Sequence, residues 1–438
     1  MTRSYDECLN EMYGLRRFGI KLGLDVITGI LSGLDNPHLS FSTIHIAGTN
    51  GKGSIASYLS SILHASGYRV GLYTSPHLIR FNERIQINGQ EVSDNDVIEA
   101  WESVKNAYSG EREPTFFEYT TAMALYLFYK AGVEWAVVET GMGGRLDATN
   151  LLTPKLAIIS NISLEHRFYL GNTIAEIAGE KAGIIKPKTP VICGATQPSA
   201  IQVIEKKAYE CNAPVFRLKK DFRIRRQAND KFTYYGMDVR WPDMHTPLFG
   251  EHQKDNAALA LAASEVLMKS GANLNPDSIR AGLESTKWPG RLEIIRHKPG
   301  VCPEIILDGA HNLDASRKIA KFLKTHARGR EITLVIGILD DKPRKGILKA
   351  LVPLCRRIII TEPEIDRAFP AERLLPEVLK MKKDARIISG VDNAVKYVLE
   401  TTNSDQIICI AGSLYVVGEA RRYLEALFNP RRTKNHNK

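Results

Sequence analysis

A glycine-rich segment lies between a short apolar run and a helical pattern, and its residue types suit the binding of phosphate. Residues 48–54 read Gly-Thr-Asn-Gly-Lys-Gly-Ser, after an expected strand over 42–47 and before an expected helix. Backbone N–H groups at the start of such a helix, together with its dipole, favour an anion. Lys52 adds a positive charge, and Ser54 adds a hydroxyl that can ligate Mg²⁺. The segment therefore predicts a phosphate-binding loop.

The segment departs at two positions from the common G-x-x-x-x-G-K-[ST] loop. Ile46 stands where the first glycine belongs, and Gly53 places Ser54 one residue beyond Lys52. An ordinary glycine-rich turn with a surface lysine is the alternative interpretation. The departures favour a different family of ATP-using proteins.

Three further residues have the chemistry to complete a site. Glu139 ends a nearly continuous apolar run, which predicts a strand buried on both faces. Ligands of open α/β sheets lie just outside such strand ends, where a carboxylate can hold Mg²⁺ against nucleotide phosphates. His166 follows the next expected strand, and Lys181 lies on an expected short helix. Taken alone, the three residues also fit a solvated acid, a structural histidine and a surface lysine.

Eight segments occur in an order that resembles a known family. They are residues 48–54, 74–78, 81–85, 139–150, 180–184, 250–256, 308–312 and 412–415. Together they resemble the folylpolyglutamate synthase and dihydrofolate synthase family, in its bacterial bifunctional type, which is a branch of the Mur-type ATP-dependent amide ligases. The resemblance covers nearly the whole chain.

Length and element order predict two α/β domains. A chain of 438 residues exceeds one typical core, and alternating strands and helices predict a parallel sheet with helices on both faces. We expect an N-terminal P-loop-type parallel-sheet domain over 1–295, with ATP-binding and folate-binding loops and an antiparallel hairpin region within 215–248. A smaller C-terminal Rossmann-like α/β domain is expected over 296–438. Its predicted strands lie at 305–307, 332–338, 357–360, 386–388 and 407–410.

The resemblance assigns the catalytic and metal-binding roles. The catalytic residues are Lys52, Glu139, His166 and Lys181, and the metal ligands are Ser54, Ser75, Glu139 and His166. His166 matches a histidine that helps to hold a second Mg²⁺ near the γ-phosphate. Lys181 matches a lysine that carries a carbamate in many members, which predicts that its side chain points inward. Glu165 stands where the family usually has Asp and is left out of the site.

The resemblance also assigns residues to ATP and to the folate acceptor. The ATP-binding residues are Thr49, Asn50, Gly51, Lys52, Gly53, Ser54, Asn256, Arg291, Asp308 and His311, with Asn256 at the adenine and Arg291 at the phosphates. Asp308 and His311 belong to the ribose and phosphate side, so the second domain is expected to close over ATP. The acceptor-binding residues are Ser75, His77, Phe81, Arg84, Phe117 and Tyr415. Phe116 and Phe117 offer aromatic surface for a flat pterin, and packing in the core is the alternative for both.

Composition excludes other classes of protein. The net charge of +10 suits acidic small molecules, and neither basic run, 217–226 or 431–438, carries a nucleic-acid motif. No apolar run is long enough to cross a bilayer, and no signal or organelle-targeting segment is found. The six cysteines are scattered without metal spacing, which is typical of a reducing compartment. We expect a cytoplasmic monomer that binds neither nucleic acid nor membrane.

The expected reaction is ATP-dependent amide formation on folates. The resemblance implies that the γ-phosphoryl group of ATP is transferred to a carboxylate and that L-glutamate then attacks the product. It also implies that ATP is a substrate and that two Mg²⁺ ions take part. The expected acceptors are 7,8-dihydropteroate and tetrahydrofolate. The alternatives are a folylpolyglutamate synthase alone, a Mur-type ligase of cell-wall precursors, or a nucleotide-binding regulatory module. Segments 74–78 and 81–84 favour folate, and the separate Glu139, His166 and Lys181 speak against a module without chemistry.

Overall fold

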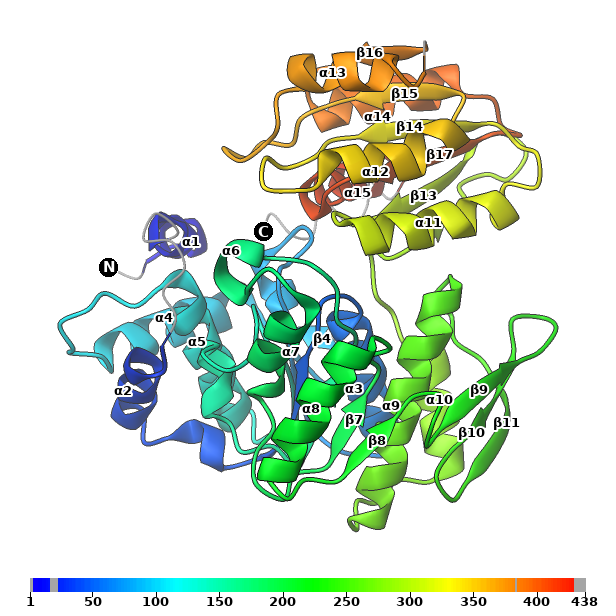
Figure 1. Ribbon diagram of the computed structural model, residues 1–438. Coiled ribbons are helices and arrows are strands. Elements are labelled where there is room, and N and C mark those ends of the chain that lie inside the picture. The colour runs from blue at the N-terminus through cyan, green and yellow to red at the C-terminus, as the bar shows by residue number, and fades with distance from the viewer. Residues whose placement is uncertain (1–2, 16–22, 383, 429–438) are drawn as a thin grey trace. The chain divides into compact units, whose positions relative to one another are not determined.

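The computed structural model describes residues 3–15, 23–382 and 384–428, and the chain divides into two compact units (Figure 1). The first comprises Met1–Pro247 and Gln253–Lys287, and the second Leu248–His252 and Trp288–Lys438. The predicted boundary between residues 295 and 296 therefore falls inside the second unit. The reason is strand β12 (Glu293–Ile295), which sequence reasoning did not find and which pairs with β13 (Glu304–Asp308) of the second sheet.

The first unit is built on one large sheet with the strand order β4-β3-β2-β5-β1-β6-β7-β8. Strands β2, β5, β1, β6, β7 and β8 are parallel, whereas β3 and β4 form an antiparallel edge. The bounds are β1 Ser42–Ala47, β2 Val70–Tyr73, β3 Ile85–Ile87, β4 Gln90–Glu91, β5 Trp135–Glu139, β6 Leu156–Ile159, β7 Val191–Cys193 and β8 Val215–Arg217. The predicted parallel sheet is confirmed.

Helices cover both faces of this sheet (Figure 1). Helix α3 packs on β1, β2 and β5, while the opposite face carries apolar clusters that include residues of α5, α7 and α8. The helices are α1 Tyr5–Gly14, α2 Asp25–Gly33, α3 Lys52–Ala65, α4 Asp94–Asn106, α5 Phe116–Lys130, α6 Arg167–Leu170, α7 Ile174–Ala182, α8 Pro198–Glu210, α9 Glu251–Lys269 and α10 Pro276–Ser285. The 3₁₀ turns are η2 Pro37–Leu39, η3 Phe81–Arg84 and η4 Ala148–Leu151.

The expected antiparallel region forms a separate small sheet. Its strands β9 (Arg223–Arg226), β10 (Phe232–Tyr235) and β11 (Arg240–Met244) have the order β11-β10-β9. One face buries Phe232, Tyr234 and Trp241. The basic run 217–226 therefore ends in strand β9 of this antiparallel sheet, in line with the strand pair that its alternation with apolar residues predicts.

The second unit is a smaller α/β fold with the strand order β12-β13-β17-β14-β15-β16. All neighbours are parallel except β12, which runs antiparallel to β13. The other strands are β14 Ile332–Ile336, β15 Arg357–Ile360, β16 Ala385–Ile387 and β17 Ile407–Ala411. The helices are α11 Leu313–His326, α12 Arg344–Leu351, η5 Val352–Leu354, α13 Ala371–Leu379, α14 Val391–Thr401 and α15 Leu414–Phe428.

None of the described helices is both long and apolar enough to cross a membrane.

Candidate active site

The glycine-rich segment forms the turn between β1 and α3, as its sequence predicts. Gly51 has a φ of +88° and precedes the first helical residue, Lys52. Gly48 is required for a steric reason, because a Cβ at this position would lie 1.8 Å from the Ser160 hydroxyl. Ser54 lies in the first turn of α3 and is buried. The start of α3 thus presents backbone N–H groups beside a lysine, which is the geometry of an anion site.

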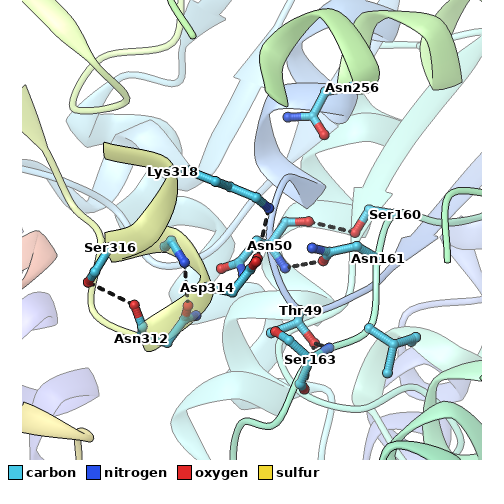
Figure 2. Close-up of polar contacts among 12 residues, drawn as sticks. Thr49, Asn50, Ser160, Asn161, Ser163, Asn256, Asn312, Asp314, Ser316 and Lys318 are labelled. Carbon is cyan, nitrogen blue, oxygen red and sulfur yellow. Dashed lines mark hydrogen bonds and ion pairs between the residues drawn. The ribbon is translucent and has the colours of Figure 1, made fainter. Parts of the chain in front are cut away.

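The segment that follows β6 holds this turn in place (Figure 2). The Asn50 amide donates to the Asn161 side-chain oxygen at 2.7 Å, and the Ser160 hydroxyl donates to the Asn50 carbonyl at 2.7 Å. The Thr49 hydroxyl donates a hydrogen bond to the Ser163 carbonyl and accepts one from the Ser163 amide. The neighbouring strand end therefore fixes both the path and the orientation of the loop.

Lys52 and Glu139 come together at the carboxyl ends of β1 and β5. The Lys52 Nζ lies 3.5 Å from Glu139 Oε1, and the two side chains are 15% and 6% exposed. The other carboxylate oxygen, Oε2, accepts a hydrogen bond of 3.2 Å from the Ser75 backbone amide. Three residues from separate predicted motifs thus meet at one point of the sheet edge.

Lys181 points inward, as predicted, and reaches the phosphate-binding loop. Its Nζ donates to the Gly48 carbonyl at 2.7 Å, and the residue is 4% exposed. Burial, with the nearby charge of Lys52 as the second cause, lowers the pKa of Lys181 to about 7. A substantial fraction of this side chain is therefore a neutral amine at neutral pH.

The oxygen donors at this edge fit a hard divalent cation. Glu139 supplies a carboxylate, and Ser54 and Ser75 carry hydroxyls on the flanking segments. Among the residues described here, no group of three or more His, Cys, Asp and Glu side chains forms a metal cage of its own. Mg²⁺ is commonly held by one or two carboxylates together with substrate phosphates. The donor set thus fits a metal that arrives with a nucleotide.

His166 adopts an unusual backbone conformation at the start of α6. Its φ is +50°, in the left-handed region, and its ring lies 4.0 Å from Glu165 Oε1. The side chain is 35% exposed. Non-glycine residues in this region cost free energy and recur at functional sites. The predicted metal role of His166 stays a prediction.

A cluster of rings and a guanidinium follows β2. Arg84 donates from Nε to the His77 Nδ1 at 2.8 Å and stacks over the Phe116 ring at 5.1 Å. Tyr13 of α1 contacts both rings, with centroids 6.3 Å from His77 and 5.8 Å from Phe116. Phe81 is 1% exposed and packs behind His77 and Phe116, in the core. Its predicted contact with substrate stays a prediction.

Phe117 lies against the loop that follows Glu139. A Cβ on Gly141 would come within 2.5 Å of the Phe117 ring, and Tyr73 packs on the same ring at 6.1 Å. Phe117 is partly buried against the core. Both sequence-based alternatives for this residue, core packing and a substrate surface, are compatible with that position.

The remaining predicted ATP residues lie in different units. Asn256, on α9 of the first unit, is adjacent to Gly51, where a Cβ would come within 2.6 Å of its side chain. In the second unit, Asp308 accepts from the amides of Leu292 and Ala310 at 2.7 and 2.8 Å. Burial raises the pKa of Asp308, and the charge of nearby Arg291 opposes the rise.

His311 completes this group at the end of β13, with its ring Nδ1 2.9 Å from the Gly309 carbonyl. The structure therefore brings Arg291, Asp308 and His311 together. Tyr415, in the first turn of α15, belongs to the second unit, unlike the other predicted acceptor residues, and its role stays a prediction.

Sequence reasoning missed several residues that shape the site. Asn161 and Ser163 follow β6 directly, so the same strand-end rule that singled out Glu139 could have found them. Tyr13 lies far upstream in a helix without a motif. The missed residues that contact the site are Tyr13, Tyr73, Ser160, Asn161 and Ser163.

Comparison with known proteins identifies the family of this chain. The model of the Mur ligase middle domain matches residues 46–264, and that of the Mur ligase glutamate ligase domain matches residues 290–414. A Bacillus subtilis (strain 168) protein named dihydrofolate synthase/folylpolyglutamate synthase is 36% identical, over 97% of this chain and 100% of its own. The chain belongs to this family.

Solved structures of family members share the fold. Escherichia coli FolC in complex with DHPP and ADP superposes with a TM-score of 0.88 at 29% identity, covering 97% of this chain and 100% of its own. The Yersinia pestis bifunctional folylpolyglutamate synthase/dihydrofolate synthase, complexed with AMPPNP and Mn ion, gives 0.86 at 30% identity, covering 97% and 98%. The resemblance inferred from the eight segments and the predicted fold class are both confirmed.

Proposed function

We propose that this chain is an ATP-dependent ligase that adds L-glutamate to 7,8-dihydropteroate and to tetrahydrofolate. The observation that carries the proposal is the meeting of Lys52, Glu139 and the Ser75 amide at the start of α3. That arrangement suits a nucleotide triphosphate with its divalent cation. The acceptors come from the bifunctional name of the 36% identical relative and from the aromatic cluster around Phe116.

The first half-reaction activates the carboxylate of the acceptor, which is a poor electrophile by itself. A carboxylate oxygen of the acceptor attacks the γ-phosphorus of ATP, the bond to the bridging oxygen breaks, and ADP leaves. The product is an acyl phosphate. The loop amides at the start of α3 and the Lys52 ammonium stabilise the negative charge on the transferring group. Glu139, with the Ser54 and Ser75 hydroxyls, would hold Mg²⁺, which would supply positive charge against the phosphates, and His166 would help to hold a second ion.

The second half-reaction forms the amide. The neutral amine of L-glutamate attacks the acyl carbon, the bond from that carbon to the phosphate oxygen breaks, and inorganic phosphate leaves with a proton released from the nitrogen. The buried edge around Glu139 limits access of water to the acyl phosphate, which water would otherwise hydrolyse.

Lys181 is proposed to carry a carbamate in the active enzyme. Its neutral amine would attack CO₂, forming an N–C bond and releasing one proton. Because the pKa is about 7, the neutral fraction rises as the pH rises through 7, so the modification forms more readily at pH 8 than at pH 6.

Removal of CO₂ and bicarbonate at pH 8 is therefore expected to lower turnover, and added bicarbonate to restore it. Native mass spectrometry should detect the mass of one CO₂ on the wild type and not on Lys181→Arg. Turnover that is indifferent to bicarbonate, with no added mass, would remove the carbamate from the proposal.

Phe117→Ala is expected to raise the KM for the folate acceptor about 10-fold and to leave the KM for ATP unchanged. The substitution removes an aromatic surface whose stacking contributes roughly 1.4 kcal/mol, which corresponds to this change. Steady-state kinetics with each substrate varied separately measure both constants. An equal rise in both KM values would assign Phe117 to general packing around Gly141.

The deciding experiment supplies ATP, Mg²⁺ and labelled L-glutamate with 7,8-dihydropteroate or tetrahydrofolate in separate reactions. Label is expected to enter both folates, with one ADP formed for each glutamate added. Label with tetrahydrofolate alone indicates a folylpolyglutamate synthase. If label enters neither folate, the result favours a Mur-type ligase of cell-wall precursors. If neither the acceptor nor glutamate stimulates ATP turnover, the result indicates a nucleotide-binding module.

The proposal also includes a cytoplasmic monomer. All six cysteines are unpaired, which fits a reducing compartment. Light scattering coupled to size exclusion would test the monomer, with a mass near 48.9 kDa expected.

A further inference from the structure

A histidine is buried in the middle of the central sheet, away from the residues discussed so far. His45 lies on β1, is 0% exposed, and its ladder neighbours are Val138 of β5 and Ala157 of β6. Both neighbours belong to the apolar clusters that cover this face. A parallel strand that is buried on both faces is expected to carry an apolar residue here, so the presence of an imidazole calls for an explanation.

The imidazole begins a chain of hydrogen bonds. His45 Nε2 lies 2.7 Å from the Thr149 hydroxyl, which lies 2.6 Å from Asp147 Oδ1. Burial raises the pKa of Asp147, but hydrogen bonds from the Met142 and Thr149 amides oppose the rise and favour the ionised form. An ionised carboxylate only accepts, so Thr149 donates to Asp147 and accepts from His45. The proton of His45 is thereby assigned to Nε2. Burial, together with the charge of Lys186, lowers the pKa of His45 to about 3, so the ring stays neutral.

Asp147 is the acceptor around which the loop after Glu139 folds. Its Oδ2 accepts from the Met142 amide at 2.8 Å, and its Oδ1 accepts from the Thr149 amide at 3.1 Å. Asp147 is 4% exposed. Met142 is three residues beyond Glu139, so Asp147 bridges the start and the end of the same loop.

The far side of this loop is attached to the helix that carries Lys181. The Arg145 amide donates to the Glu180 carbonyl at 2.7 Å, and Gly144 is so close that a Cβ would lie 2.9 Å from the Lys181 carbonyl. Displacement of the loop would therefore move both Glu139 and α7.

Stability alone does not explain the imidazole. The His45 Nδ1 is buried and has no hydrogen-bond partner. A buried acceptor without a partner costs free energy, whereas an aliphatic side chain at this position would pack against Val138 and Ala157 without that cost. Residues that lower stability in this way recur where function requires a fixed geometry.

We propose that His45 is a positioning residue that acts through the Thr149 hydroxyl on Asp147, and so holds the loop between Glu139 and Lys181 in its metal-binding geometry. The inference deepens the proposed function and rests on it. Groups that orient metal ligands from behind commonly change metal affinity or activity by ~10- to 100-fold when removed.

The test compares isosteric and conservative variants of the full chain. Thr149→Val removes the hydroxyl and Thr149→Ser keeps it, whereas His45→Leu removes the donor and His45→Gln offers another at similar reach. Thr286→Val is the matched control, since its buried hydroxyl donates at 2.9 Å to the Gly282 carbonyl, outside this network. Each variant is measured for kcat, KM for ATP, Mn²⁺ affinity with a non-hydrolysable ATP analogue, Tm, and hydrogen exchange of the peptide 140–147.

Thr149→Val and His45→Leu are expected to lower kcat and Mn²⁺ affinity ~10-fold, with KM for ATP near the wild-type value and faster exchange in 140–147. Thr149→Ser and His45→Gln should recover most of both losses. The double variant His45→Leu/Thr149→Val should be no worse than Thr149→Val, since both residues act through one bond. Thr286→Val should lower Tm and leave the other measurements unchanged.

Three outcomes would overturn the proposal. They are losses that multiply in the double variant, unchanged exchange in 140–147, or a fall in activity that merely follows Tm as in Thr286→Val. If the wild type adds no glutamate to either folate, the proposed function fails by itself. The exchange measurement then still decides whether His45 holds the loop.

Discussion

Lys52→Ala is expected to reduce glutamate addition by roughly 10³-fold or more while the fold remains intact. The ammonium is 3.5 Å from Glu139 at the start of α3, where the γ-phosphoryl group would bind. Removal of a preorganised donor from developing charge typically costs roughly 10²- to 10³-fold in kcat. Lys52 also attracts the ATP phosphates before the reaction, so kcat and the affinity for ATP should both fall.

Steady-state kinetics and calorimetric binding of a non-hydrolysable ATP analogue measure the two effects. Lys130→Ala is the matched control, because it removes an ion-paired lysine from α5 of the same unit, at the protein surface. Thermal unfolding confirms that both variants are folded. Turnover close to wild type in a folded Lys52→Ala would exclude the lysine from phosphoryl transfer, and with it the proposed form of the site.

Much of the fold could be predicted because apolar patterning is local. The runs at 135–139 and 407–410 are nearly continuous hydrophobic stretches, 42–47 alternates loosely with Ile44 and Ile46 as its apolar positions, and each of the three is a central strand of its sheet. The edge strand β12 was missed because it has three residues and follows a segment rich in Pro and Gly. That single omission moved the predicted domain boundary beyond the division at Lys287.

The candidate site likewise contains some residues that local patterns predict and others whose contacts form only in the folded sheet. Lys52 and Glu139 could be found because each stands beside a glycine-rich turn at the end of a recognisable strand. The contacts of Asn50 with Asn161, and of His45 with Thr149, join residues more than 100 positions apart. Apolar patterning specifies which faces are buried, but it does not specify which polar side chains pair within them. Those pairs depend on strand order, which only the folded sheet defines.

Glu139→Gln is expected to lower turnover by about 10²-fold at ordinary Mg²⁺ and to raise the Mg²⁺ concentration needed for half-maximal rate. The amide keeps the shape of the side chain and can still accept from the Ser75 amide, which bonds at 3.2 Å in the wild type. It lacks the charge that binds a hard cation and that pairs with Lys52. Loss of a metal-held phosphate clamp removes several kcal/mol of stabilisation from the transition state, so the effect should exceed that of the positioning residues.

Glu134→Gln is the matched control, because Glu134 lies at the opposite end of β5, immediately before Trp135, and accepts from the Arg69 amide. Its turnover and Mg²⁺ requirement should match those of the wild type. The turnover and Mg²⁺ requirement of Glu139→Asp should lie between those of Glu139→Gln and Glu134→Gln, because the shorter side chain keeps the negative charge but places it farther from the cation. A Glu139→Gln enzyme with the wild-type Mg²⁺ requirement would show that the cation is held elsewhere. The ion pair with Lys52 would then serve to orient the lysine in the absence of ATP.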